Sequence, residues 1–188
     1  MKVEETARQL LDARNGQRLV TFKADSVLNR RLDFSLDFKL AVAGTIDGKI
    51  WVWEVATGEP IAVFTGHTSE VTTCAFSSDG KILASGDNSS TIKLWDLVEK
   101  RGLKTLRASS GMIRSIDFSP DQKTLATSSH DGVLTLWSVA SGRELMTLSD
   151  LVSPNSFAVF TAGAGALLCG GEDGRLYAFR APSWAEIK

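Results

Sequence analysis

Residues 82–96 read Ile82-Leu83-Ala84-Ser85-Gly86-Asp87-Asn88-Ser89-Ser90-Thr91-Ile92-Lys93-Leu94-Trp95-Asp96. Two short runs of apolar and β-branched residues flank a polar cluster at 87–90, a pattern typical of two strands joined by a tight turn. A further strand is predicted at 71–76, followed by the turn Ser77-Ser78-Asp79-Gly80, and another at 61–64. Residues 61–96 therefore predict one small four-stranded antiparallel sheet.

The same pattern returns along the chain at a fixed spacing. Each step is 42 residues in two series, Phe34, Phe76, Phe118 and Phe160, and Trp53, Trp95, Trp137 and Phe179. A fixed period of about 40 to 45 residues indicates a blade repeat. A sheet with one uncovered apolar face is best covered by a copy of itself, and radial repetition of such copies gives a propeller. We expect repeats at 17–58, 59–100, 101–142 and 143–182, with a tail at 183–188.

Two segments of the second repeat carry a family resemblance. Gly66-His67 followed by Leu94-Trp95-Asp96 resembles the GH…WD frame of WD40 repeats, and Val52-Trp53-Glu54 and Leu136-Trp137-Ser138 are weaker versions of its end. The resemblance covers roughly residues 17 to 181. It implies an all-β propeller of four-stranded antiparallel WD40-like blades, about four per chain.

The resemblance also implies a buried network of a loop His, a strand Ser or Thr, a turn Asp and the strand Trp. Carried over by position, the network residues are His67, Ser85 and Trp95 in the second repeat, Thr127, Asp131 and Trp137 in the third, Asp47 and Trp53 in the first, and Asp173 in the fourth. Ser89 stands at the turn Asp position of the second repeat, and Ser109 at the His position of the third. We therefore expect no repeat to have the whole network, and the substitution Ser89→Asp to raise the melting midpoint.

Four blades are too few for the seven- or eight-membered rings of this family. The outer strand expected at 19–22 has no complete blade before it, and the last strand, at 176–179, has no outer strand after it. We expect a second chain to complete the ring, each chain donating residues 17–23 to the other in a twofold dimer. The alternative is a terminal piece of a longer propeller.

Residues 1–16 bear on this choice. Leu11 lies 42 residues before Trp53, so this extension can be the relic of a preceding Trp strand. The other interpretation is a short amphipathic helix with Val3, Ala7, Leu10 and Leu11 on one face.

Composition narrows the function classes. Among 188 residues, 43% are hydrophobic, 23% are charged and the net charge is −1. This balance lacks the basic excess that nucleic acid or an anionic membrane surface requires. Neither a membrane-spanning apolar run nor a signal-peptide core is present in the sequence, so we expect a cytoplasmic protein. Cys74 and Cys169 lie in apolar runs and are expected to be buried.

The sequence shows no convergent catalytic set. His67 and His130 are the two histidines, and neither a Gly-rich phosphate loop nor a GxSxG motif occurs. The cluster at 87–90 lacks the spaced carboxylates of a calcium loop. We predict no catalytic residue, no cofactor and no metal site.

A binding surface is the better prediction. In the family, the loops before the inner strand and before the Trp strand form one face, here called the loop face, where partners dock. The candidate partner-binding residues are Asp25, Asn29, Arg30, Lys49, Trp51, Glu70, Asp87, Arg114, His130, Glu172, Arg175 and Tyr177. Simple solvation is the alternative for each charged residue, and packing for Trp51 and Tyr177. We predict a non-catalytic scaffold for a protein partner; the alternatives are a regulatory or sensory segment of a multidomain protein, and an enzyme.

Overall fold

The computed structural model describes residues 6–29, 31–109, 111–149, 155–161, 165–171 and 173–180. In these ranges the chain forms strands and turns and no helix. The expected all-β fold of four-stranded antiparallel sheets is confirmed. Residues 6–11 form a strand, so the helical interpretation of this segment is wrong.

Three sheets are complete four-stranded blades, in which the strands follow each other in chain order. Blade 1 holds β3 (Asp33–Phe34), β4 (Leu40–Gly44), β5 (Ile50–Glu54) and β6 (Pro60–Phe64). Blade 2 holds β7 (Val71–Phe76), β8 (Ile82–Asp87), β9 (Thr91–Asp96) and β10 (Arg101–Arg107). Blade 3 holds β11 (Ile113–Phe118), β12 (Thr124–Ser129), β13 (Leu134–Ser138) and β14 (Glu144–Leu148).

Two further sheets lie at the ends of the chain. The first pairs β1 (Thr6–Leu11) with β2 (Arg18–Ala24), and the last contains β15 (Asn155–Phe160), β16 (Ala166–Gly171) and β17 (Leu176–Arg180). Within the described part of the chain, β17 pairs with β16 alone, whereas the equivalent strands β5, β9 and β13 each carry an outer strand as well.

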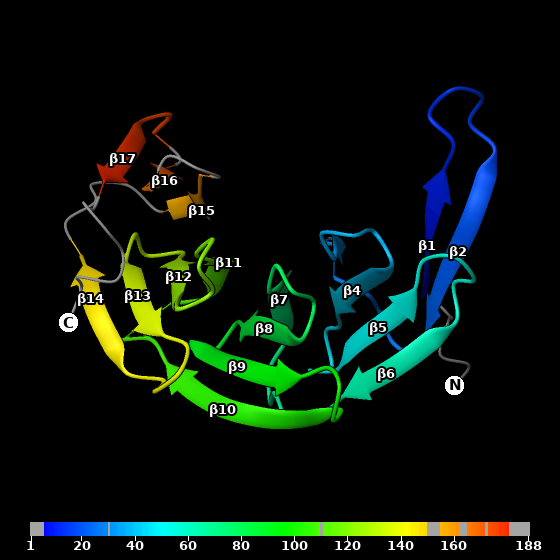
Figure 1. Cartoon of the computed structure of the whole chain (residues 1–188), viewed down its shortest axis with the longest axis horizontal. Helices are drawn as coiled ribbons and strands as arrows, with labels where there is room; N and C mark the ends of the chain where they lie inside the picture. Colours follow the sequence, from blue (N-terminus) through cyan, green and yellow to red (C-terminus); the bar gives the residue numbers. More distant parts are fainter. Residues whose placement is uncertain are drawn as a thin grey trace.

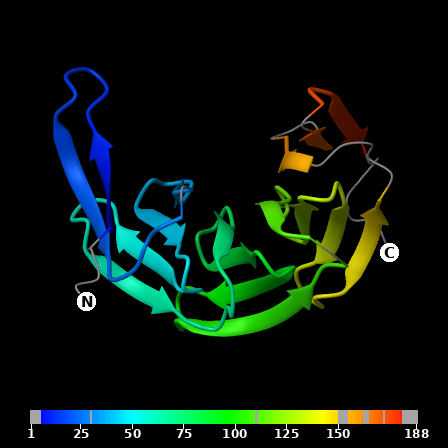
Figure 2. The same cartoon turned by 180° about the vertical axis from the view of Figure 1, so that it is seen from behind.

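The sheets stand side by side in an open arc (Figure 1). The inner strands β7, β11 and β15 lie toward the concave side, and β6, β10 and β14 run along the convex side, as the view from behind also shows (Figure 2). The β1–β2 hairpin and the last sheet form the two ends of the arc. Closure of this arc by a second chain therefore remains a proposal.

Each blade buries one face against the next. Ile50 and Val52 of blade 1 join Val71, Leu83 and Trp95 of blade 2 in one core cluster. The equivalent residues of blades 2 and 3 do the same with the sheets that follow them. Because full burial of one large aliphatic side chain contributes about 1.5–3 kcal/mol, these repeated interfaces hold the arc together.

A glycine in the middle strand allows the blades to approach closely. A Cβ atom on Gly86 would lie 2.5 Å from Ile113 Cγ2, and one on Gly44 would lie 2.5 Å from Val71 Cβ. The backbone of one blade thus packs directly on a β-branched side chain of the next.

Candidate functional site

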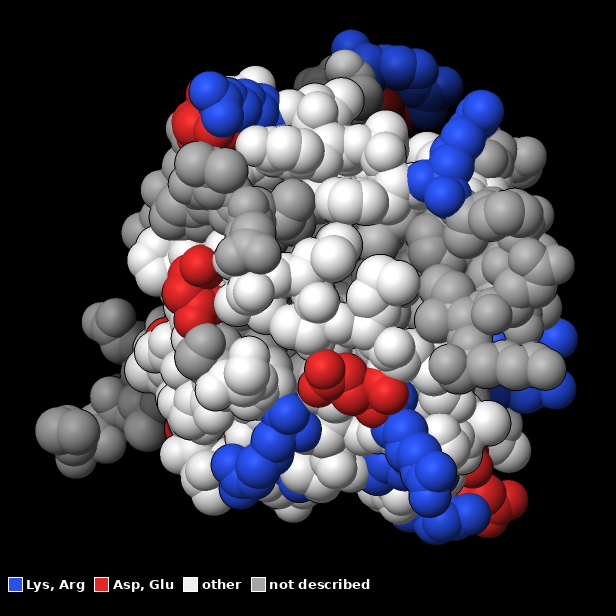
Figure 3. All heavy atoms as spheres, turned by 90° about the vertical axis from the view of Figure 1, so that its left-hand side faces the viewer, with Lys and Arg blue, Asp and Glu red and all other residues white. Residues whose placement is uncertain are grey.

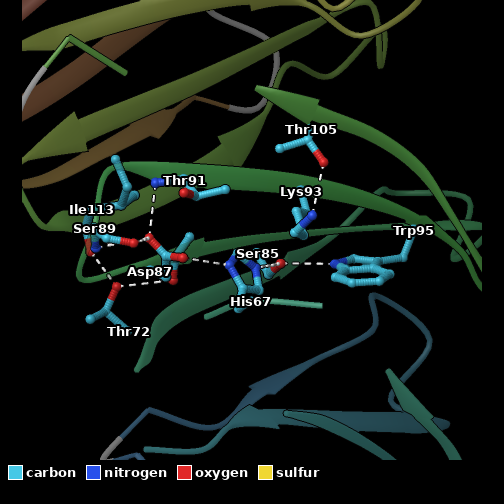
Figure 4. Close-up of polar contacts among 11 residues, drawn as sticks. His67, Thr72, Ser85, Asp87, Ser89, Thr91, Lys93, Trp95, Thr105 and Ile113 are labelled. Atoms are coloured by element: carbon cyan, nitrogen blue, oxygen red, sulfur yellow. Dashed lines mark hydrogen bonds and ion pairs between the residues drawn. The ribbon is translucent and has the colours of Figure 1, made fainter. Parts of the chain in front are cut away.

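Blade 2 contains a continuous chain of buried hydrogen bonds (Figure 4). Trp95 Nε1 donates to Ser85 Oγ at 2.8 Å, and Ser85 Oγ lies 2.7 Å from His67 Nε2. His67 Nδ1 lies 2.8 Å from Asp87 Oδ2. Burial lowers the pKa of His67, although Asp87 acts in the opposite direction, so the imidazole is neutral and donates from Nδ1 to the carboxylate.

The acid of this network is Asp87, not the residue at the expected turn position. Asp87 Oδ1 also accepts from the Ser89 amide at 2.9 Å, the Ser89 hydroxyl at 3.0 Å and the Thr91 amide at 2.8 Å. The expectation that Ser89 leaves the second repeat without its carboxylate is wrong. Asp87 is also wrong as a partner-binding candidate on the loop face, because its exposed fraction is 0%.

The other blades explain this exchange of positions. In blade 1 the hydroxyl of Thr45 donates to Asp47 at 2.5 Å, and in blade 3 the hydroxyl of Ser129 donates to Asp131. In these two blades the hydroxyl residue comes first and the acid follows two residues later. In blade 2 the order is reversed, with Asp87 first and Ser89 two residues later. Ser89 lies 42 residues after Asp47 and 42 residues before Asp131. The repeat spacing therefore predicts the acid at Ser89, whereas it lies two residues earlier, at Asp87.

The remaining networks are shorter. Trp137 Nε1 donates to Thr127 Oγ1 at 2.9 Å in blade 3, where the exposed Ser109 takes the His position. Trp53 Nε1 donates to the backbone carbonyl of Lys23 at 2.9 Å in blade 1. In the last sheet, Asp173 accepts from the Arg175 amide at 3.0 Å.

The Ser85–His67–Asp87 chain is not a nucleophilic triad. Ser85 has an exposed fraction of 0%, and its oxygen already accepts the indole N–H of Trp95. A nucleophile has to reach a substrate, and this hydroxyl faces the interior of the blade. These hydrogen bonds connect the loop containing His67 to strands β8 and β9, so their role is to stabilise the blade.

The predicted partner-binding residues lie in pairs rather than singly. Lys49 Nζ contacts Asp25 at 3.1 Å and Asp47 at 3.3 Å. Asn29 Nδ2 donates to Glu70 Oε1 at 2.8 Å, joining the loops of neighbouring blades. These contacts order the loop face.

Four other candidates make contacts within a single blade or sheet. Arg114 donates to His130 Nδ1 at 3.1 Å within blade 3. Trp51 is half-buried and stacks on Trp53, with 6.1 Å between the ring centroids, and the half-buried Tyr177 packs against the core of the last sheet. Arg30 and Glu172 lie outside the described residues.

Sequence reasoning missed two acids on the concave side. Asp33 and Asp117 line an open cavity of about 680 Å³ together with residues of all four inner strands. Asp117 Oδ2 accepts the backbone N–H of Phe160 at 2.6 Å, joining blade 3 to the last sheet. Burial raises the pKa of Asp117 to about 6 and also raises that of Asp33. Asp33 and Asp117 lie 84 residues apart, which equals two repeats, and this spacing could have indicated the two acids from the sequence.

Several kinds of site are not found in the described part of the chain. It contains no group of three or more His, Cys, Asp and Glu side chains that could hold a metal ion. The thiols of Cys74 and Cys169 are free, and burial raises the pKa of both. No helix of the described residues is long and apolar enough to cross a membrane.

These antiparallel blades, arranged around a common concave side, define a propeller-type repeat architecture. The family model described as WD domain, G-beta repeat, matches residues 58–96 and 101–138. The resemblance to the WD40-repeat family is confirmed for these two segments, which contain blade 2 and most of blade 3. No curated protein sequence matches the chain.

Proposed function

We propose that this chain is a non-catalytic, cytoplasmic scaffold that binds a protein partner through its loop face. WD40 repeats generally serve as protein-interaction scaffolds. The observation that carries the proposal is the cross-blade bond of 2.8 Å between Asn29 and Glu70, because it aligns loops of successive blades into one ordered surface. Ordered polar loops on a rigid support are typical binding elements.

Affinity capture with quantitative mass spectrometry tests the loop face. Glu70→Ala combined with Arg175→Ala should release specific bound proteins, since both positions lie on this face. Lys123→Ala is the matched control, because β12 separates its turn from the loop face. Equal retention by both variants contradicts the proposal.

We further propose that two chains close the ring as a dimer. Leu176 has an exposed fraction of 63%, whereas the equivalent Ile50, Ile92 and Leu134 are at 0%, 0% and 1%. In the three complete blades the next sheet covers this position, so the last sheet has a face suited to another sheet. Figure 3 shows this side of the molecule, where residues other than Lys, Arg, Asp and Glu occupy much of the middle, and an acidic side chain flanked by basic ones lies just below them.

Light scattering across a concentration series tests closure. The mass should rise toward that of two chains, and Leu176→Lys should keep it at one chain, because a charge cannot be buried unpaired in such an interface. A mass that Leu176→Lys leaves unchanged contradicts closure through this sheet.

A further inference from the structure

The β1–β2 hairpin has the register of the two outermost strands of a complete blade. Leu10 pairs with Val20 and Leu11 with Arg18, with a bulge between them. Exactly 42 residues later, Val52 pairs with Ala62 and Trp53 with Pro60, with a bulge at the same place. β1 therefore occupies, beside β2, the position that β5 occupies beside β6.

One cross-strand pair of this hairpin differs from its equivalents. In the complete blades an apolar residue faces an apolar residue, in the pairs Ile50–Phe64, Ile92–Leu106 and Leu134–Leu148. In the hairpin Phe22 faces Arg8. In the same register, β17 would place Leu176 opposite Phe22. Cross-strand pairs of apolar residues stabilise a sheet, so β17 is the better partner for β2.

Arg8 holds β1 in place through polar contacts instead. Its Nη2 donates to the backbone carbonyls of Leu28 and Asn29 at 3.3 Å and 3.2 Å. Phe22, in contrast, is anchored to blade 1, with its ring centroid 5.6 Å from that of Trp53. Phe64 contacts Trp95 in the same way at 5.1 Å. β2 therefore has its own contacts to blade 1, although Leu10 of β1 also packs against this core.

We infer that β1 is a removable stand-in for β17 of a second copy of this chain. On assembly, β17 of one copy displaces β1 of the other and pairs with its β2, so that the last sheet gains its fourth strand. Exchange of an identical element between protomers is a low-cost route to dimers. It also covers the edge of β17 that is open in the described part of the single chain. This inference rests on the proposed ring closure and adds that β1 limits it.

Light scattering on three variants of the full chain tests the competition. Removal of residues 1–11, or Arg8→Ala, should tighten the apparent Kd of dimerisation by at least about tenfold, equivalent to about 1.4 kcal/mol. Arg14→Ala is the matched control, because Arg14 contacts Asp12 within the same hairpin and should leave the Kd unchanged.

The outcomes separate the two proposals. An equal Kd for the full and the shortened chain overturns the competition and leaves dimerisation standing. A shortened chain with the mass of one chain at every concentration overturns both.

Cross-linking tests the register directly. One chain with Val20→Cys is mixed with another carrying Ala178→Cys, because these positions correspond to the pair Ala62–Val52. A disulfide between the two chains, formed faster in the absence of residues 1–11, is expected. A dimer without this cross-link overturns strand exchange.

Discussion

His67 and Asp87 form the centre of the blade 2 network, with Nδ1 and Oδ2 2.8 Å apart and both side chains fully buried. The carboxylate accepts three further bonds from residues 89 and 91. Because four donors surround the carboxylate, three on Oδ1 and one on Oδ2, the buried charge is well matched, whereas a half-satisfied network would destabilise the blade. Blade 2 is therefore expected to be the most rigid of the three.

Asp87→Ala should destabilise the protein strongly. The change leaves His67 Nδ1–H and three donors of the turn without an acceptor in a buried site, and each unsatisfied donor costs about 1–3 kcal/mol. Urea denaturation measures the loss. Ser89→Ala, the control, removes one hydroxyl bond and should cost about 0.5–1.5 kcal/mol. Ser89→Asp should give no gain, because it would bring a second carboxylate next to Asp87. A larger loss in the Ser89 variants would contradict the assignment.

The sequence predicted the blades well because each repeat contains several independent local features that indicate the same fold. The turns containing Asp37, Asp79 and Asp121 carry the same serine–aspartate bond, of 2.8, 2.7 and 2.6 Å. The aromatic residues recur in step with them. Such local chemistry fixes a turn or a strand without reference to the rest of the chain.

The sequence was less informative where a side chain acts across blades or two residues share one task. A fixed step could not find Asp87, because the acid and hydroxyl had exchanged positions. Asp117 bonds to the backbone of the next sheet, a contact that depends on how the two sheets pack. For β1 the spacing of Leu11 from Trp53 indicated a strand, but the pattern of Val3, Ala7, Leu10 and Leu11 fitted a helix as well, so the sequence left both open.

Gly86→Ala should destabilise the interface of blades 2 and 3. The new methyl group would stand 2.5 Å from Ile113, so one blade must shift, at a cost of about 1–3 kcal/mol. Gly102→Ala is the control, since its Cβ would lie 3.7 Å from Trp95, an ordinary contact. Thermal unfolding of the two variants should show a clear loss for Gly86 alone. Similar midpoints would mean that the blades are less tightly packed than described.

Gln122→Gly should stabilise the protein. Gln122 has a φ of 62°, and its counterpart Gly80 has a φ of 68°. A left-handed conformation costs a side-chain-bearing residue about 1–2 kcal/mol, which glycine avoids. Glycine is also more flexible in the unfolded chain, and this entropy offsets part of the gain. We therefore expect urea denaturation to show a net rise in unfolding free energy of about 0.5–1 kcal/mol. A lower midpoint would show that contacts of the Gln122 side chain outweigh the backbone strain.

Asp117 should make stability depend on pH in the direction opposite to that of most carboxylates. Burial raises its pKa to about 6, against the effect of the bonds from the Phe160 and Phe118 amides. The folded protein thus binds this proton more tightly than the unfolded chain does. The contribution of protonated Asp117 to stability is complete at pH values below the pKa of this carboxyl in the unfolded chain. It is lost as the pH rises through about 6.

Asp117→Asn removes this loss, because the amide oxygen can still accept from Phe160 but cannot ionise. Relative to the parent, the variant should gain about 1 kcal/mol of unfolding free energy between about pH 5 and 7.5. Shared groups such as His67 cancel in this difference. Asp121→Asn is the control: the Ser119 hydroxyl and the Lys123 amide keep the pKa of Asp121 below its usual value although burial opposes them, so that carboxyl is ionised at both pH values. A constant difference for Asp117→Asn would show that this carboxylate is well solvated at the concave side.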